Sequence, residues 1–239
     1  MRVTIHELIS GAKRARGLTV IIDVFRAFSL ECYMFRQGAG AVHPVGSLEE
    51  AFRLKELHPD WILFGERGGA RVEGCEYGNS PSSIENADLS GRTIIHTTSA
   101  GTQGIVNARG ASRILTGSLV NAAAVAEYIR TVQPEEVSLV AMGKAGLATA
   151  EEDVLCAEYL QSLILGEPLR PNPCYEGTDI RTAVRGLRKK GGDHFFDPAR
   201  QHIYPERDFE LCTRLDSFPL VMEVVQENGL YLSKPVRCR

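Results

Sequence analysis

The sequence predicts an α/β fold: a three-layer α/β/α arrangement with a largely parallel or mixed sheet, and a C-terminal segment ending in a β-hairpin. Short runs of apolar and β-branched residues alternate with helix-like segments, as expected when helices cover both faces of a sheet. Residues 18–23 (LTVIID) form a continuous apolar run that is typical of a fully buried strand. Near the end of the chain, Glu227-Asn228-Gly229 separates two apolar runs, and Asn and Gly tolerate the positive φ of a tight hairpin.

The other elements follow in order along the first two thirds of the chain. We expect a helix over residues 27–38 and a second one over residues 48–57, for which Ser47 is a suitable N-cap. An alanine-rich stretch predicts a helix over residues 122–131, and a 3.6-residue apolar period predicts another over residues 151–165. The remaining predicted strands are residues 41–45, 61–64, 92–96, 112–116 and 137–142.

The last third of the chain has a different character. Residues 179–190 are typical of a basic amphipathic helix, ended by two glycines, and residues 221–226 and 230–234 are the strands of the hairpin. We expect residues 1–165 to form an α/β core that carries the active-site loops. Residues 166–239 are expected to form a C-terminal lobe or wrap, with one continuous domain as the alternative.

Composition narrows the class of protein. The 239 residues carry a formal net charge of −3, which argues against a dedicated nucleic-acid binder. Six cysteines are scattered without a C-x-x-C pair, which favours free thiols in a reducing compartment. No secretory signal and no run near the roughly 20 apolar residues of a membrane span are found, so we expect a cytoplasmic protein without a membrane partner.

Charged residues follow the first strand, at the end of an open α/β sheet where ligands usually bind. Asp23 is placed to hold Mg²⁺, and Arg26, three residues later, is placed to bind a phosphate through its two-pronged guanidinium. The alternative is that Asp23 caps the next helix and Arg26 forms a salt bridge.

A glycine-rich segment follows the strand at 61–64. Glu66 and Arg67 are embedded among glycines whose backbone can approach a ligand closely, and Asn79 and Ser80 add neutral donors farther on. Two ordinary glycine turns are the alternative interpretation.

Two further segments follow strands. The hydroxyl-rich run of residues 97–102 is suited to hold phosphate oxygens, although an N-cap needs only one of these residues. Glu152 and Asp153 begin a helix, where acidic residues are favoured by the helix dipole, but they are also placed to complete a Mg²⁺ site. The sequence contains no P-loop, no G-x-S-x-G nucleophile elbow and no histidine cluster for zinc.

Taken in order, the motifs DVFRA, GERGG, EGCEYGNSP, TTSAGT and EED resemble those of the 2-phosphosulfolactate phosphatase family. The resemblance covers residues 18–165, with a looser likeness in the final third. It implies a Mg²⁺-dependent acid phosphatase with a three-layer α/β fold. The substrate that it implies is (2R)-phospho-3-sulfolactate, which is converted to sulfolactate and phosphate in coenzyme M biosynthesis.

The site residues predicted from the motifs and the resemblance fall into three groups. The catalytic candidates are Asp23, Arg26, Glu66 and Arg67. The metal ligands are Asp23, Glu66, Glu152 and Asp153. The substrate- and phosphate-binding residues are Gly68, Gly69, Asn79, Ser80, Thr97, Thr98, Ser99, Gly101 and Thr102.

The chain departs from the family pattern at residues 28–30, at residues 75–77 and at Ala100. Because lost hydrogen-bond donors change which partner a site accepts, two alternatives stay open: another small phosphorylated acid as substrate, or a non-catalytic domain that binds a phosphometabolite. A second anionic group on the substrate is expected to meet Lys144 or Arg71. The sequence leaves the oligomeric state open and leaves room for a homo-oligomer.

Overall fold

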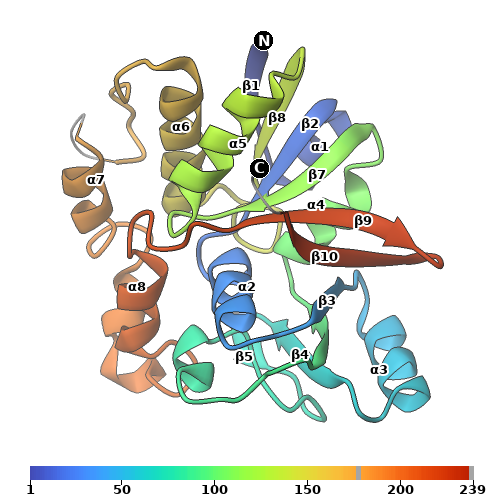
Figure 1. Cartoon of the computed structure of the whole chain (residues 1–239). Helices are drawn as coiled ribbons and strands as arrows, with labels where there is room; N and C mark the ends of the chain where they lie inside the picture. Colours follow the sequence, from blue (N-terminus) through green and yellow to red (C-terminus); the bar gives the residue numbers. More distant parts are fainter. Residues whose placement is uncertain (176–178, 237–239) are drawn as a thin grey trace.

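The computed structural model describes residues 1–175 and 179–236, and these residues form a ten-stranded sheet surrounded by helices (Figure 1). The α/β class predicted from the sequence is confirmed, and so is the C-terminal hairpin. The strands are β1 (Arg2–Glu7), β2 (Gly17–Ile22), β3 (Ala41–Pro44), β4 (Ile62–Arg67), β5 (Ala70–Arg71), β6 (Thr93–Thr97), β7 (Ala111–Gly117), β8 (Glu136–Ala141), β9 (Val221–Glu227) and β10 (Leu230–Val236).

The helices lie between and around these strands. The α-helices are α1 (Leu8–Arg14), α2 (Ala27–Arg36), α3 (Leu48–Leu57), α4 (Gly101–Asn107), α5 (Ala122–Val132), α6 (Glu151–Leu165), α7 (Ile180–Gly186) and α8 (Glu206–Cys212). Three short 3₁₀ helices are η1 (Pro81–Ile84), η2 (Asp193–Phe196) and η3 (Pro198–Arg200).

The sheet contains two parallel blocks. Its strand order is β1-β8-β2-β7-β9-β10-β3-β6-β4-β5, in which β1, β8, β2 and β7 run parallel to one another, as do β3, β6 and β4. Along β2, Val20 and Ile22 pack with residues of α5 and α6, whereas Ile21 packs with residues of α1 and α4. Because successive strand side chains point to opposite faces, helices cover both faces of the first block.

The C-terminal hairpin joins the two blocks. Strand β9 pairs antiparallel with β7 of the first block, and β10 pairs antiparallel with β3 of the second (Figure 1). Asn228 and Gly229 both have positive φ, at 52° and 81°, as the turn sequence predicts. The sequence did not place this hairpin inside the sheet. The division of the chain at residue 165 stays a prediction.

Most predicted elements are confirmed, with bounds that differ by a few residues. Ser47 caps α3 through a hydrogen bond from the Glu50 backbone N–H, at 3.1 Å. The basic helix predicted over residues 179–190 is shorter than expected: α7 ends at Gly186, a residue of low helix propensity, and turns follow. Elements β1, α1 and α8 were not predicted, because each is short and has no clear apolar period.

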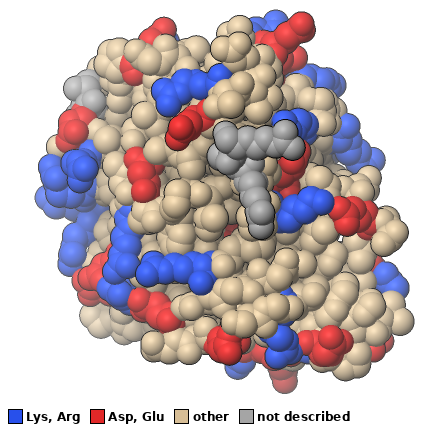
Figure 2. All heavy atoms as spheres, in the orientation of Figure 1, with Lys and Arg blue, Asp and Glu red and all other residues tan. Residues whose placement is uncertain are grey.

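The distribution of surface charge and the state of the cysteines are as the composition predicts. Positive and negative side chains are interspersed over the face shown in Figure 2. Within the described residues, the five cysteines other than Cys238 are free thiols, and Cys238 itself lies outside these residues. No helix in the described part of the chain is long and apolar enough to cross a membrane.

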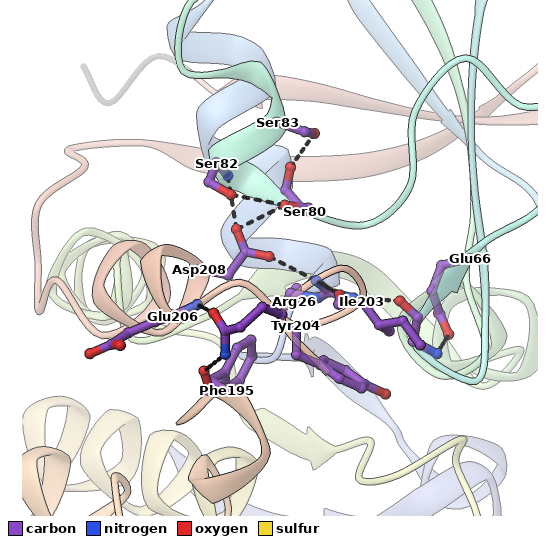
Figure 3. Close-up of polar contacts among 12 residues, drawn as sticks. Arg26, Glu66, Ser80, Ser82, Ser83, Phe195, Ile203, Tyr204, Glu206 and Asp208 are labelled. Carbon is purple, nitrogen blue, oxygen red and sulfur yellow. Dashed lines mark hydrogen bonds and ion pairs between the residues drawn. The ribbon is translucent and has the colours of Figure 1, made fainter. Parts of the chain in front are cut away.

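A segment from η2 to α8 packs against the carboxyl-terminal edge of the sheet. It is held there by a buried ion pair, in which Arg26 Nη1 lies 2.7 Å from Asp208 Oδ2 and the two side chains are 3% and 0% exposed (Figure 3). The other carboxylate oxygen of Asp208 accepts hydrogen bonds of 2.9 Å from Ser80 Oγ and the Ser82 backbone N–H. One carboxylate thus connects α8, the start of α2 and η1.

We expect Asp208→Ala to lower the free energy of unfolding by about 3–5 kcal/mol, because it leaves the buried guanidinium of Arg26 without a counter-charge. Chemical denaturation measures the change. The matched control is Glu210→Ala on the same helix, whose ion pair with Arg207 is exposed at 2.7 Å and should matter far less. Equal losses in the two variants would contradict the structural role of the buried pair.

Helix α2 contains a buried carboxyl group close to the junction of the hairpin and the first block. Residues 27–34 are all buried, and Glu31 Oε2 accepts a hydrogen bond from Thr116 Oγ1 on β7. Burial raises the pKa of Glu31 to about 7, against the opposing effect of this hydrogen bond. The folded protein therefore holds a proton on Glu31 that the unfolded chain releases at lower pH.

The stability contributed by this proton should be complete below pH 4.5, the ordinary pKa of Glu, and should be lost as the pH rises through about 7. The loss corresponds to about 3 kcal/mol in the free energy of unfolding. We expect Glu31→Gln to remove this loss, as measured by urea denaturation from pH 4.5 to pH 8. Glu49→Gln, at an exposed position of α3, should keep the wild-type dependence. An unchanged pH profile in Glu31→Gln would contradict the assignment.

Candidate active site

A cavity of about 420 Å³ opens where several strands end. Residues at or just beyond the carboxyl ends of β2, β4, β6 and β8 line it, together with Asn79 before η1 and the first turn of α6, and the segment of residues 193–204 supplies the rest of the lining. Parallel strands deliver their carboxyl ends to the same edge of a sheet, so loops that are far apart in the sequence meet there.

Asp23 is the carboxylate at the end of β2. Its Oδ1 accepts a hydrogen bond of 3.1 Å from the Ala27 backbone N–H at the start of α2. Burial raises the pKa of Asp23 to about 6, and the negative charge of Glu66 raises it further, while hydrogen bonds from Ala27 and Gly101 oppose the shift. Asp23 thus caps a helix, as the alternative interpretation expected, and also faces the cavity.

Glu152 and Asp153, in the first turn of α6, bring two more buried carboxylates to the cavity. Asp153 accepts hydrogen bonds of 2.8 Å from the backbone N–H groups of Val24 and Gly143, which connects the ends of β2 and β8. Burial, followed by the charges of Asp23 and Glu152, raises the pKa of Asp153 well above its ordinary value.

Glu152 is the least satisfied of these groups. Its Oε2 is buried and has no hydrogen-bond partner within the described residues. Burial raises the pKa of Glu152 to about 8, and the charge of Asp23 adds to this, whereas Lys144 opposes it. A buried oxygen without a donor, next to other carboxylates, is an acceptor available to a cation.

Glu66, near the end of β4, organises two loops. Its oxygens accept hydrogen bonds from the Gly69 backbone N–H and from both the N–H and the hydroxyl of Ser99, at 3.2 and 3.1 Å. The glycine turn after β4 is therefore fastened to the turn after β6. Positive φ values of 60° at Gly68 and 87° at Gly69 make glycine the suitable residue at both positions of this turn.

The two predicted phosphate-binding arginines are engaged by the protein itself. Arg26 donates from Nη1 to Asp208 and to Ile203 O, and from Nη2 to Gly69 O at 2.6 Å (Figure 3). Arg67 donates to Glu66 O and, at 2.9 Å, to Thr97 Oγ1, and it does not line the cavity. In this structure both guanidinium groups tie loops together, and only Arg26 reaches the cavity wall.

Asn79 presents an amide to the cavity from the segment before η1. Its Oδ1 lies 3.3 Å from Nε2 of His96, a fully buried residue on β6 whose pKa burial lowers to about 4. An amide oxygen only accepts hydrogen bonds, so the neutral imidazole must donate from Nε2. This fixes the orientation of Asn79 and leaves its NH₂ group as a donor toward the cavity.

The C-terminal segment adds residues that the sequence analysis missed. Asp193, His194, Arg200 and Tyr204 line the cavity, and the Tyr204 hydroxyl donates to Gly68 O at 3.1 Å. Residues 193–207 have no helical or strand period, so no pattern assigned them a place in the sheet. Their concentration of histidine, tyrosine and arginine is the one signal that marks them as a candidate binding segment.

The structure brings nine of the predicted site residues to the cavity and leaves six outside its lining. The nine are Asp23, Arg26, Glu66, Gly68, Gly69, Asn79, Ser99, Glu152 and Asp153. The six outside the lining are Arg67, Ser80, Thr97, Thr98, Gly101 and Thr102. Lys144 lines the cavity, whereas Arg71 points its guanidinium at the carbonyls of Cys75 and Glu76.

Two hydroxyl groups of the turn after β6 form hydrogen bonds with backbone groups of the same turn. Thr98 and Thr102 exchange hydrogen bonds, with the N–H of each residue donating to the hydroxyl of the other, at 3.0 and 3.2 Å. The Thr98 hydroxyl therefore accepts from an N–H group in the first turn of α4, although the N-cap residue of that helix is Ala100 and not the Thr or Ser of the alternative interpretation. Ser99 is the hydroxyl of this turn that faces the cavity.

The carboxylates line the same cavity, but they do not form a complete set of metal ligands. In the described part of the chain, no three His, Cys, Asp or Glu side chains converge closely enough to hold a metal ion by themselves. Asp23, Glu152 and Asp153 are the side chains best placed to ligate a cation that also keeps water or substrate oxygens. Their raised pKa values reflect burial and mutual repulsion, which a cation would relieve.

Comparison with known proteins identifies the family. The family model described as 2-phosphosulpholactate phosphatase matches residues 3–227. A probable 2-phosphosulfolactate phosphatase of Caldicellulosiruptor saccharolyticus is 37% identical over 85% of this chain and 87% of its own length. Those of Thermotoga petrophila and Bacillus subtilis are 34% and 28% identical, covering 90% and 88% of this chain and 91% and 88% of their own lengths. The chain therefore belongs to the 2-phosphosulfolactate phosphatase family, whose named activity is that of a phosphoric monoester hydrolase.

Proposed function

We propose that this protein hydrolyses 2-phosphosulfolactate to sulfolactate and phosphate in the cavity at the carboxyl edge of the sheet, with Mg²⁺ as its cofactor. The observation that carries the proposal is the distribution of charge in the cavity. Five carboxylates, Asp23, Glu66, Glu152, Asp153 and Asp193, line the same space as three cations, Arg26, Lys144 and Arg200.

The need for a cation follows from electrostatics. A phosphate ester that enters the cavity meets carboxylates at short range, and like charges in a poorly solvated site repel strongly. Asp23, Glu152 and Asp153 would hold Mg²⁺, with Glu66 fixing the adjacent loops. When bound, Mg²⁺ would neutralise the developing negative charge on the phosphoryl oxygens. The buried Oε2 of Glu152, which lacks a donor, is the atom that supports this assignment best.

The chain's own residues would position the phosphoryl group. The NH₂ group of Asn79, oriented by His96, is a donor that an equatorial phosphoryl oxygen can accept. The Glu66–Ser99 hydrogen bonds hold the turns after β4 and β6 in a fixed arrangement, so the donors need not reorganise during the reaction. A carboxylate at the cavity is available to orient the attacking water.

The departures from the family pattern fall mostly outside the cavity. Phe28 and Leu30 are buried core residues of α2, and Cys75 is buried with its sulfur close to Gly65. Ala100 alone among these positions lines the cavity. The lining positions that belong to the family motifs therefore keep the residues of the family pattern except at Ala100, which favours the family's substrate over a different phosphorylated acid.

The direct test is release of inorganic phosphate from 2-phosphosulfolactate by the purified protein. We expect turnover that a chelator abolishes and added Mg²⁺ restores, because the substrate needs the cation to approach the carboxylates. Turnover of other phosphorylated acids but not of this one would contradict the proposed substrate and indicate a phosphatase for a different phosphorylated acid. Binding without turnover of any phosphoester would indicate a non-catalytic domain.

Glu152→Gln tests the metal site separately from the reaction. We expect phosphatase activity to fall by about 100-fold or more, because the variant loses a charge that holds the cation. Mg²⁺ should raise the melting temperature of the wild type but not of the variant, since binding only to the folded state stabilises it. The metal-free variant should melt no lower than the metal-free wild type, because an amide of similar shape replaces a carboxyl beside other carboxyls.

The neighbouring Glu151→Gln is the matched control, because Glu151 belongs to the same helical turn but does not line the cavity. It should keep the Mg²⁺-induced rise in melting temperature. A rise of equal size in Glu152→Gln would contradict the role of Glu152 as a ligand.

A further inference from the structure

Three cations line the cavity within the described residues: Arg26, Lys144 and Arg200. The buried carboxylate of Asp208 neutralises Arg26, and the carbonyl oxygens of Ile203 and Gly69 accept two more of its N–H groups. The side chains of Lys144 and Arg200 make no hydrogen bond or ion pair with any described residue. Two positive charges are therefore left to bind something that the protein itself does not supply.

Arg200 is the more firmly positioned of the two. Its guanidinium lies over the ring of Tyr204, 4.6 Å from the ring centroid, and Arg26 lies over the same ring at 5.1 Å. The Tyr204 N–H donates to Arg200 O at 2.8 Å, and the Tyr204 hydroxyl is fixed to Gly68 O. Stacking on an aromatic ring leaves the edge of the guanidinium and its N–H groups available for an anion.

His194 lies in the same part of the cavity as Tyr204, with the two ring centroids 4.5 Å apart. Burial, followed by the charges of Arg200, Lys144 and Arg26, lowers the pKa of His194 to about 4, against the opposing effect of Asp193. The imidazole is therefore neutral at physiological pH and does not add a positive charge of its own. Lys144 and Arg200 supply positive charge to the cavity, and Asp193, which also lines it, forms no ion pair with either of them among the described residues.

The substrate of the proposed function has two anionic groups besides its phosphate. In 2-phosphosulfolactate, the carboxylate carbon is bonded directly to the carbon that bears the phosphate ester, whereas the sulfonate sulfur is one bond farther away. Lys144 directly follows Gly143, whose backbone N–H donates to Asp153 Oδ2 at 2.8 Å, so it belongs to the metal-binding side of the cavity. Arg200 comes from the C-terminal segment.

We propose that Arg200 is the specificity-determining residue that binds the sulfonate group of the substrate, an inference that rests on the proposed function. Lys144 then meets the carboxylate group, which is closer to the phosphorus. A guanidinium offers two parallel N–H groups to two oxygens of a sulfonate, and such charge-assisted pairs are stronger and more directional than a single point charge. Two unpaired cations match two anions that the metal site does not use.

The experiment compares two substrates in two variants. The substrates are 2-phosphosulfolactate and 2-phospholactate, which lacks the sulfonate, and the variants are Arg200→Gln and Arg188→Gln. We expect Arg200→Gln to lower kcat/KM for 2-phosphosulfolactate about 10- to 100-fold, chiefly through KM, and to lower that for 2-phospholactate far less. Arg200→Lys should recover part of the loss.

Arg188→Gln is the matched control. Arg188 belongs to the same C-terminal third and also stacks on an aromatic ring, that of Phe196 at 3.8 Å, but it does not line the cavity. It should keep the wild-type ratio between the two substrates. Thermal melting checks that each variant is folded.

A third substrate, the phosphate ester of 2-hydroxyethanesulfonate, keeps the sulfonate and lacks the carboxylate. Arg200→Gln should lower its kcat/KM as well. The inference is overturned if Arg200→Gln leaves the ratio of kcat/KM between the first two substrates unchanged. It is also overturned if the variant loses kcat/KM for the esters that carry the carboxylate but not for the ester that carries only the sulfonate. A wild-type protein that turns over none of these esters would overturn the proposed function itself, which is a distinguishable result.

Discussion

The ion pair between Arg26 and Asp208 joins the two parts of the molecule that form the cavity. Arg26 is the N-cap residue of α2, shortly after the end of β2 at Ile22, whereas Asp208 belongs to α8 in the last third of the chain. The same guanidinium reaches Gly69 O in the turn after β4. Because both charges are buried, separating them is costly, and the C-terminal segment is held against the loops that line the cavity.

The cavity contains both carboxylates and cations. Carboxylates from the ends of β2 and β4 and from the start of α6 line it, while Lys144 and Arg200 supply positive charge without ion-pair partners among the described residues. Burial and mutual repulsion raise the pKa values of Asp23, Glu152 and Asp153, which is an unfavourable arrangement unless a cation enters. Such strain at a site is typical of function, because stability alone would favour neutral or paired groups.

The hairpin formed by β9 and β10 explains how distant loops meet in this fold. It fills the position between β7 and β3, so two parallel blocks become one sheet. Its turn was predictable, because Asn228-Gly229 is a local signal that depends on backbone sterics. Its place in the sheet was not predictable, because an apolar strand carries no local information about which strands it will pair with.

Local sequence patterns were enough to predict the α/β class, most strand and helix positions, the family, and the loops that supply Asp23, Glu66, Asn79 and Glu152. These follow from periodicity, capping and motif spacing, which are local properties of the chain. Only the tertiary structure decided that Arg26 and Arg67 serve as ties between loops, and that Arg200 and Tyr204 complete the cavity. An arginine has the same sequence signature whether its partner is a carboxylate of the protein or an anion of the substrate, and only the fold supplies or withholds that partner.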